Sequence, residues 1–123
     1  MFILTILQGT YTWTDKRKYV GEFVDNFMHG KGIYLWGDGR RYEGEYINDK
    51  KHGFGKYVWA DGRAYIGYWV NGKQDGYGKY ILKDKSASIG LWSKGKRIKW
   101  INEQELEKLK NNKSFMKILV SEI

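Results

Sequence analysis

The segments Tyr42-Glu43-Gly44-Glu45-Tyr46-Ile47 and Gly53-Phe54-Gly55-Lys56-Tyr57-Val58-Trp59 each alternate between two kinds of side chain. A period of two is typical of β-strands, because successive side chains of a strand point to opposite faces. The residues between the two segments, Asn48–His52, are polar and have the composition of a turn. Together these residues predict a β-hairpin.

The hairpin recurs along the chain with a period of 23 residues. Positions that keep this step include Tyr19, Tyr42 and Tyr65, then Gly21, Gly44, Gly67 and Gly90, then Tyr34, Tyr57 and Tyr80. The joints contain Asp38-Gly39 and Asp61-Gly62, a dipeptide that favours hairpin turns. We therefore expect an array spanning residues 1–101, with a half repeat at 9–18, full repeats at 19–41, 42–64 and 65–87, and a degenerate half repeat at 88–97.

The composition limits the class of protein. The chain has 123 residues, which fits one domain, and its 16 glycines with no proline suit many tight turns. Cysteine is absent, which excludes disulfides and cysteine-based zinc sites and favours an intracellular protein. The net charge of +8 concerns partners and solubility rather than fold.

Alternation in these strands sorts the aromatic residues and glycines onto one face, the aromatic face. Its rings are Tyr19, Phe23, Tyr34, Trp36, Tyr42, Tyr46, Tyr57, Trp59, Tyr65, Trp69, Tyr80 and Trp92. Two interpretations are compatible with this pattern. In the first, the rings pack over the bare backbone of the glycines. In the second, the rings form a groove that receives a partner peptide or helix, since Tyr and Trp are common anchors at interfaces.

The sequences Tyr42-Glu-Gly-Glu-Tyr46, His52-Gly-Phe-Gly-Lys-Tyr57 and Asp61-Gly62, at this spacing, resemble the MORN repeat, the "membrane occupation and recognition nexus" module. The resemblance covers roughly residues 9–97. It implies an all-β fold, an elongated and twisted antiparallel sheet of stacked hairpins. MORN proteins mostly act as scaffolds in the cytoskeleton, in cilia and in membrane-associated complexes, and some bind acidic phospholipids. Departures from the pattern, such as Lys16, Lys85 and Ser88, lie in the terminal hairpins.

Residues 102–123 differ in character and predict one amphipathic α-helix over about 103–120, loosened at Asn111-Asn112. Its apolar stripe is Leu106, Leu109, Met116, Val120 and Ile123. We expect Leu106, Leu109 and Met116 to pack over Trp92 and Trp100 and to cover the open edge of the sheet near 89–93. The alternative is that the helix docks on a partner.

No arrangement of residues predicts catalysis, a metal site or a cofactor. His29, His52 and Asp75 hold the same position in successive repeats, but neighbouring repeats lie roughly 9–10 Å apart, too far for ligand atoms that must lie about 2 Å from zinc. The glutamates Glu22, Glu43 and Glu45 are expected to be solvated strand residues. The chain is therefore not expected to be an enzyme.

A basic cluster, Lys94, Lys96, Arg97 and Lys99, is either a solvated loop or a site for an acidic partner or lipid. No motif for nucleic-acid binding is found. The predicted function is a non-catalytic interaction or scaffold module in a cytoskeletal, ciliary or other large assembly. The alternative is a peripheral membrane module that binds anionic phospholipids. The expected location is the cytoplasm, at the cytoskeleton, a cilium or the cytoplasmic face of a membrane.

Overall fold

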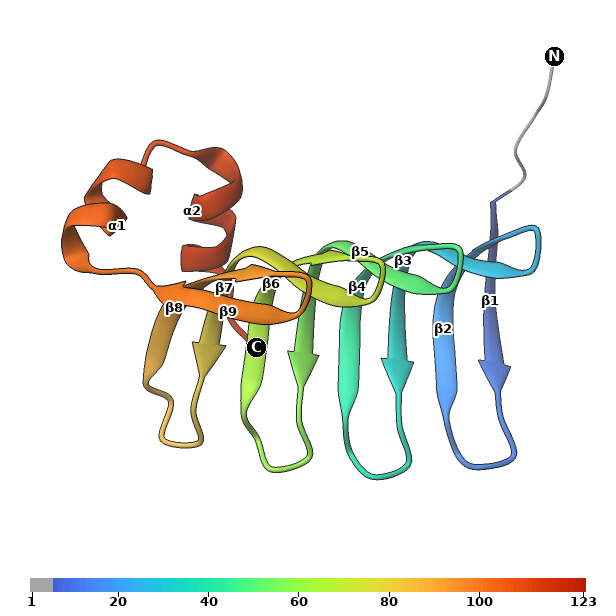
Figure 1. The fold of residues 1–123 in the computed structure, drawn as a ribbon. Coiled ribbons are helices and arrows are strands. Elements are labelled where there is room, and N and C mark those ends of the chain that lie inside the picture. The colour runs from blue at the N-terminus through green and yellow to red at the C-terminus, as the bar shows by residue number, and fades with distance from the viewer. Residues whose placement is uncertain (1–5) are drawn as a thin grey trace, which may run out of the picture.

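A computed structural model describes residues 6–123, so the first five residues of the predicted 1–101 array lie outside the described residues. Within them, nine strands form one open antiparallel sheet in the order β1 to β9, followed by two helices (Figure 1). The elements are β1 Leu7–Thr12, β2 Lys18–Val24, β3 Phe27–Leu35, β4 Arg41–Ile47, β5 Lys50–Val58, β6 Ala64–Val70, β7 Lys73–Ile81, β8 Ala87–Ser93, β9 Lys96–Trp100, α1 Glu103–Leu109 and α2 Lys113–Val120. The expected sheet of stacked hairpins is confirmed.

One row of turns consists of two-residue turns. They are Asp25-Asn26, Asn48-Asp49, Asn71-Gly72 and Lys94-Gly95, and both residues of each pair have positive φ. Two consecutive positive φ angles define the type I′ turn, whose twist matches that of paired strands. The turn predicted over Asn48–His52 is therefore shorter than expected, and Lys50–His52 belong to β5.

The Asp-Gly pairs lie in the other row of turns, in longer loops than a two-residue hairpin. The amide of Trp36 donates to the carbonyl of Arg40 over 3.0 Å, and Gly39 has φ +98°. Lys16 and Lys85 adopt φ near +75° at the corresponding positions, so the loop geometry is kept in the terminal hairpins without glycine. A hydrogen bond inside the loop stabilises it. In the loop at residues 36–40, for example, the carboxylate of Asp38 accepts a hydrogen bond from the amide of Arg40.

The aromatic face is built on tyrosine rings that lie over glycine backbone. Tyr42 is fully buried, and its hydroxyl donates to the carbonyl of Glu45 over 2.9 Å. A Cβ atom added to Gly55 would lie 2.3 Å from the Tyr42 hydroxyl, and one on Gly44 would lie 2.5 Å from the Cα of Gly55. Tyr19 and Tyr65 repeat the arrangement in the neighbouring repeats. These glycines are required because no side chain fits beneath the ring.

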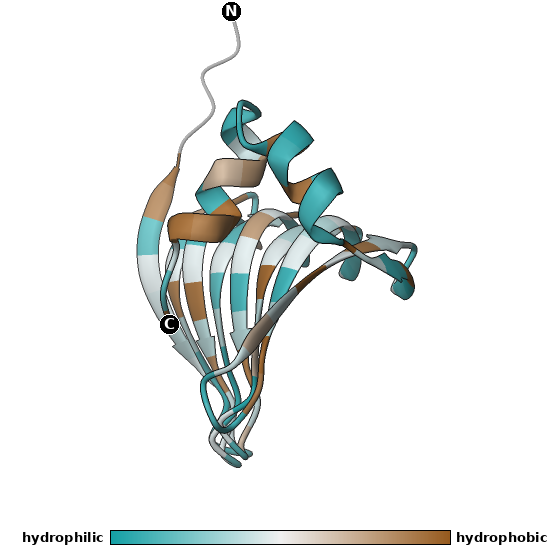
Figure 2. Ribbon diagram, turned by 90° about the vertical axis from the view of Figure 1, so that its left-hand side faces the viewer, coloured by the Kyte–Doolittle hydropathy of each residue, from teal (hydrophilic) through white to brown (hydrophobic). Residues whose placement is uncertain are grey.

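Each hairpin bends sharply toward this face. Between the pairs Gly21↔Gly32 and Phe23↔Met28, three residues of β3 oppose one residue of β2, which makes a β-bulge. Gly30 in this bulge has φ +77°. As a result, rings four residues apart on one strand come together, as with the centroids of Tyr42 and Tyr46 at 5.2 Å. In the side view the sheet curves, and the helices lie on its outer side (Figure 2).

The aromatic face therefore lines the inner side of the bend and forms the main core. The cluster contains the buried residues Tyr19, Tyr34, Tyr42, Tyr46, Tyr57, Tyr65, Trp69 and Trp92, with Trp13, Phe23, Met28, Trp36, Trp59 and Tyr80 packed against it. All twelve rings that the sequence assigned to one face belong to this cluster. A smaller cluster of Ala64, Ile66 and Ile81 lies on the opposite side, the outer face.

The predicted C-terminal helix is divided into α1 and α2. Asn102 caps α1 through a capping box with Glu105. Asn112 caps α2, because its side chain accepts a hydrogen bond from the amide of Phe115 over 3.0 Å. An asparagine at this position favours starting a helix over continuing one. The break thus falls at the Asn111-Asn112 pair, where a loosening was expected.

The helix packs on a different surface from the predicted one. Its buried residues are Phe115 and Ile118, and the Phe115 ring lies edge-to-face on Tyr77 of β7, with centroids 5.3 Å apart. Trp92 lies on the opposite side of the sheet, where its ring contacts Tyr65. The predicted packing of Leu106, Leu109 and Met116 on Trp92 and Trp100 is therefore wrong. The rings of the aromatic face bury one another. The apolar residues on the outer face of β5–β7 have no such neighbours on the sheet, and α2 packs against them.

The sheet ends at β9, so the degenerate half repeat predicted at 88–97 is part of a complete hairpin that runs to Trp100. Every residue of β9 is exposed, and the prediction that the helix covers the sheet edge is also wrong. Lys96, Arg97 and Lys99 lie along this edge. Charged side chains on an edge strand discourage pairing with another sheet, which makes a covering helix unnecessary.

Replacing Gly55 by alanine should lower the free energy of unfolding by about 1–3 kcal/mol, because the new methyl group overlaps the Tyr42 ring. Urea denaturation measures the change. The matched control is Gly9→Ala, whose Cβ would lie an ordinary 3.4 Å from Phe23 and should change stability by less than about 0.5 kcal/mol. Equal effects of the two substitutions would contradict the packing described above.

Replacing Phe115 by alanine should destabilise the protein by about 3–5 kcal/mol, because it empties the contact between α2 and the outer face. Val120→Ala is the control on the same helix, since Val120 is 71% exposed, and we expect a change within about 0.5 kcal/mol. Thermal unfolding followed by circular dichroism reports both. An unchanged melting temperature for Phe115→Ala would show that α2 does not dock on the sheet.

Candidate functional site

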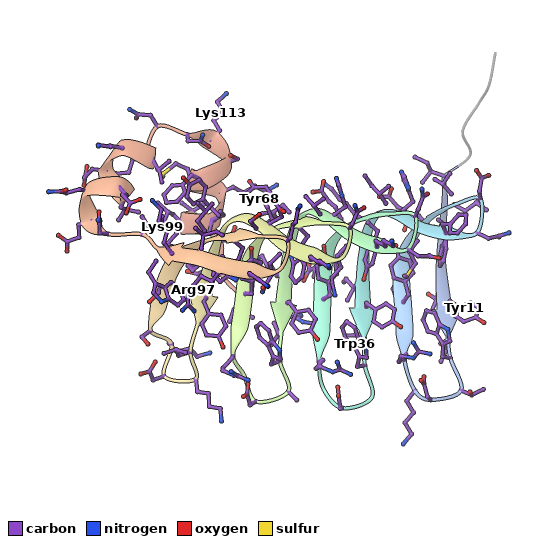
Figure 3. The ribbon with its side chains drawn as sticks, viewed as in Figure 1. Tyr11, Trp36, Tyr68, Arg97, Lys99 and Lys113 are labelled. Carbon is purple, nitrogen blue, oxygen red and sulfur yellow. The ribbon has the colours of Figure 1, made fainter. Side chains whose placement is uncertain are left out.

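The accessible part of the aromatic face is a ladder of tryptophan and arginine side chains. Trp13, Trp36 and Trp59 are half-buried, and the guanidinium carbons of Arg17, Arg40 and Arg63 lie over them at 5.0, 5.0 and 5.7 Å from the ring centroids. Trp36 points to the inner side of the bend, whereas Tyr68 lies on the side of the helices (Figure 3). The fully buried tyrosines lie beneath this ladder and serve as core.

Each arginine of the ladder is held in place by its own loop. Arg40 pairs with Asp38 at 2.8 Å, and Arg63 pairs with Asp61 at the same distance. Arg63 also donates to the hydroxyl of Tyr80 over 2.9 Å. The hydrogen bond from Arg40 lowers the pKa of Asp38, so the carboxylate stays charged at neutral pH. Contacts within the chain therefore hold the arginines of the ladder in place.

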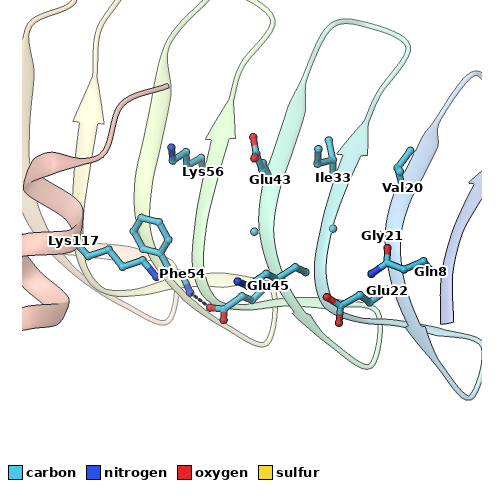
Figure 4. A pocket seen from close by; sticks show the side chains of 13 residues that line it. Gln8, Val20, Gly21, Glu22, Ile33, Glu43, Glu45, Phe54, Lys56 and Lys117 are labelled. Carbon is cyan, nitrogen blue, oxygen red and sulfur yellow. Dashed lines mark hydrogen bonds between the residues drawn. The ribbon is translucent and has the colours of Figure 1, made fainter. Parts of the chain in front are cut away.

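A hollow of about 450 Å³ lies on the outer face, over β2 to β5 (Figure 4). Val20 and Ile33 supply apolar walls, and Lys117 of α2 closes one end over the ring of Phe54, at 4.4 Å. Glu22, Glu43 and Glu45 line it with Lys31 and Lys56.

Two carboxylates of this hollow contact the backbone of the β-bulges. Glu45 accepts a hydrogen bond of 2.7 Å from the amide of Phe54 in the bulge (Figure 4). The carboxylate of Glu22 lies against Gly30, the corresponding bulge glycine of the previous repeat. Two of the three glutamates are thus placed on the bulges, a role that the sequence analysis did not assign to them.

Side chains on the outer face also form hydrogen bonds to backbone carbonyls of α2 and of the residue that follows it. The ammonium of Lys79 donates to the carbonyls of Leu119 and Ser121, over 3.1 and 2.7 Å. The hydroxyl of Tyr68 donates to the carbonyl of Ser114. The last carbonyls of a helix have no partner within the helix, so a lysine there satisfies them.

The basic cluster does not form one patch. Lys96 pairs with Ser93, and Arg97 pairs with Trp92, so consecutive residues of β9 face opposite sides of the sheet. Lys99 forms an ion pair with Glu105, and Arg97 stacks on Trp100 at 4.3 Å. The cluster is an edge strand and its turn, not a loop.

His29, His52 and Asp75 carry side chains of the kinds that bind metal ions. Among residues 6–123, no group of three His, Asp or Glu side chains is arranged to hold a metal ion. Asp75 accepts a hydrogen bond from the amide of Lys94 over 3.1 Å, and Nδ1 of His29 is buried without a hydrogen-bond partner. Of the three positions, Asp75 therefore fixes a turn of the structure.

Sequence reasoning named Trp36 and Trp59 but missed Trp13 and the arginines of the ladder, although Arg17, Arg40 and Arg63 recur at the repeat spacing and could have been found from it. It also missed the outer hollow, although Glu22 and Glu45 in its lining are 23 residues apart and could have indicated it. In the described chain, neither helix has the length and apolar character needed to cross a bilayer.

A search of the curated proteins finds no match to this chain. The family model of the MORN repeat matches three consecutive segments, residues 19–40, 42–62 and 65–87, which together make up more than half of the chain. These segments correspond to the three repeats that the spacing predicts and to strands β2 through β7. MORN repeats are a non-enzymatic module known from protein-interaction and membrane-binding proteins. The chain belongs to the MORN repeat family.

Proposed function

We propose that this chain is a non-catalytic protein-interaction module, a structural subunit of a large assembly such as the cytoskeleton or a cilium, and that a partner segment binds along its aromatic face. The observation that carries the proposal is the ladder of Trp13, Trp36 and Trp59 with its stacked arginines. Tryptophan and arginine are the residues most enriched at the energetic centres of protein interfaces. Here they form a continuous row above a rigid core.

The ladder is suited to binding because it is already ordered. Arg40 and Arg63 are each fixed by an aspartate and an indole ring. An ordered side chain loses little conformational entropy when a partner binds, so more of the contact free energy appears as affinity. The fully buried tyrosines contribute by holding the indoles in place rather than by touching the partner.

The spacing of the ladder fits a helical partner. Successive tryptophans are separated by two strands, which is roughly 9–10 Å. Side chains seven residues apart on an α-helix are separated by about 10.5 Å along its axis. An amphipathic helix lying across the strands would therefore place one side chain of each heptad between successive rungs.

Affinity purification from the native source followed by mass spectrometry identifies the partner, and variants then locate its site. We expect Trp59→Ala, or Arg40→Gln with Arg63→Gln, to weaken binding of that partner by about 30-fold, the effect of losing an interface centre worth about 2 kcal/mol. Isothermal titration calorimetry measures the affinity, and circular dichroism checks that each variant is folded.

Ile33→Gln, in the outer hollow, is the matched control and should leave the affinity unchanged. Loss of binding in Ile33→Gln with retention in the ladder variants would move the docking site to the outer face. Retention of every partner by all three proteins would reject the aromatic face and the outer hollow together.

A second candidate function is peripheral binding to anionic membranes, and the exposed edge strand favours it. Ile98 and Trp100 are 60% and 43% exposed, and they alternate with the basic residues Arg97 and Lys99. Exposed apolar side chains among basic ones suit the boundary between lipid headgroups and acyl chains. Each basic residue near an anionic surface adds about 1 kcal/mol.

Sedimentation with vesicles containing phosphatidylserine and a phosphoinositide tests this candidate. If the edge of the sheet itself faces the membrane, side chains on both sides of β9 lie near the lipid, so Lys96→Gln with Arg97→Gln should reduce binding by about 30-fold, corresponding to about 2 kcal/mol for two charges. Lys108→Gln with Lys113→Gln removes the same charge from the helices and serves as the control. Wild-type protein that stays in the supernatant at both low and high salt would remove the membrane candidate.

A further inference from the structure

Lys51 of β5 lies inside a box of four aromatic rings. Its Nζ atom is 5.9 Å from the ring centroid of Trp36, 5.6 Å from Tyr42, 5.1 Å from Tyr57 and 5.0 Å from Trp69. Among the residues that the structure describes, the ammonium has no hydrogen bond and no ion pair within 4.0 Å. The cation thus lies next to four rings and has no counter-ion among the described residues.

Four aromatic rings recur at the corresponding positions of three repeats, but in the described chain a charged side chain lies among them only in the repeat of Lys51. The residues 23 positions before and after Lys51 are Met28 and Gln74. The rings at the corresponding positions are Trp13, Tyr19, Tyr34 and Tyr46 in the earlier repeat, and Trp59, Tyr65, Tyr80 and Trp92 in the later one. Uncharged side chains therefore fill this position in the neighbouring repeats, and packing does not require the ammonium of Lys51.

The position of Lys51 is unfavourable for an isolated charge. Burial, with a smaller contribution from the nearby charge of Arg40, lowers the pKa of Lys51. Attraction between the cation and the rings offsets part of the lost hydration. An anion brought next to the ammonium would interact more strongly there than in bulk water, because the rings replace part of the hydration of Lys51.

A hollow of about 310 Å³ opens beside Lys51 on the aromatic face. Its walls are Tyr57, Trp59 and Trp69, and its polar lining is Lys51, Lys73 and Gln74. Two lysines and one glutamine therefore line a space with aromatic walls. This combination suits a carboxylate, which can accept hydrogen bonds from ammonium and amide groups.

We propose that the hollow at Lys51 binds a carboxylate side chain of an acidic partner segment lying on the aromatic face, with Lys51 and Lys73 as its cationic ligands. This inference rests on the proposed function and adds the chemistry of the partner, an Asp or Glu set among apolar residues. The other two boxes, with Met28 and Gln74, would take uncharged side chains. The charged box would therefore set the register of the partner along the array.

The test uses the full chain and three probes: a hexaglutamate peptide, a hexaglutamine peptide and inorganic phosphate. Binding is followed by the NMR signals of the Lys51 side chain and by tryptophan fluorescence. We expect hexaglutamate to shift the Lys51 signals and hexaglutamine to leave them unchanged. Lys51→Met should weaken hexaglutamate binding by about tenfold, the effect expected from losing one buried charge pair.

Lys50→Met is the matched control, because Lys50 is the exposed neighbour on the same strand and its loss removes the same net charge. It should leave the affinity for hexaglutamate nearly unchanged. Methionine occupies the corresponding position at Met28, so Lys51→Met should melt at or above the wild-type temperature. Lys51→Gln, copied from Gln74, replaces it if the methionine variant does not fold.

Equal binding of hexaglutamate by Lys51→Met and wild type overturns the inference, and so does a shift of the Lys51 signals by phosphate without one by hexaglutamate. Neither result bears on the proposed function, which fails when the ladder variants keep the native partner. If the ladder variants lose that partner while Lys51→Met keeps it at full affinity, the interaction surface stands and the carboxylate anchor is rejected.

Discussion

The structure depends on one contact, a tyrosine ring lying over the backbone of paired glycines. Tyr42 covers Gly44 and Gly55, and its hydroxyl satisfies the carbonyl of Glu45. A single sheet normally needs a second layer to bury its apolar face. Here the glycines leave room for rings to lie within the sheet's own thickness, and the bulge at Gly53 folds the strand over them. One layer thereby supplies its own core, and every other feature follows from the repetition of this contact every 23 residues.

Repetition produces surfaces rather than a single chemical centre. Each ring touches rings of its own and the adjacent repeat, as with Tyr42 against Tyr46 and Trp69, so stability and shape propagate along the array. Polar groups at the loops, such as Asp61 with Arg63, are used to order the backbone and to stack on indoles. What repeats on the inner side is a pattern of indole and guanidinium groups with a constant pitch. Under the proposed function, this pattern binds an extended partner segment.

The two faces of the sheet have different roles because strand alternation separates their residues completely. The inner side carries the rings and, at one repeat, the ammonium of Lys51. The outer face carries Ile66 and Ile81, which are covered by the chain's own helix α2 through Phe115 and Ile118. Because α2 packs on the outer side of the C-terminal repeats, it leaves the inner side of the described sheet uncovered. The departure from strict repetition at Lys51 is what gives this otherwise uniform surface a distinguishable position.

The amino-acid sequence by itself determined the period, the hairpins and the sorting of twelve rings onto one face, because these depend on local alternation and on residues such as Gly55 that tolerate no substitute. It also placed the helix start at Asn102 and the weak point at Asn111-Asn112, since caps are local. Only the tertiary structure decided which surface α2 covers. An apolar stripe shows that a helix must be buried, but Trp92 and Tyr77 are equally apolar in sequence. The bend of the hairpins decides that α2 packs on Tyr77, because it brings the rings of the inner side into contact with one another and leaves the apolar residues of the outer face exposed to the helix. The four-ring box around Lys51 is likewise tertiary, because its walls come from three different strands and the loop at Trp36.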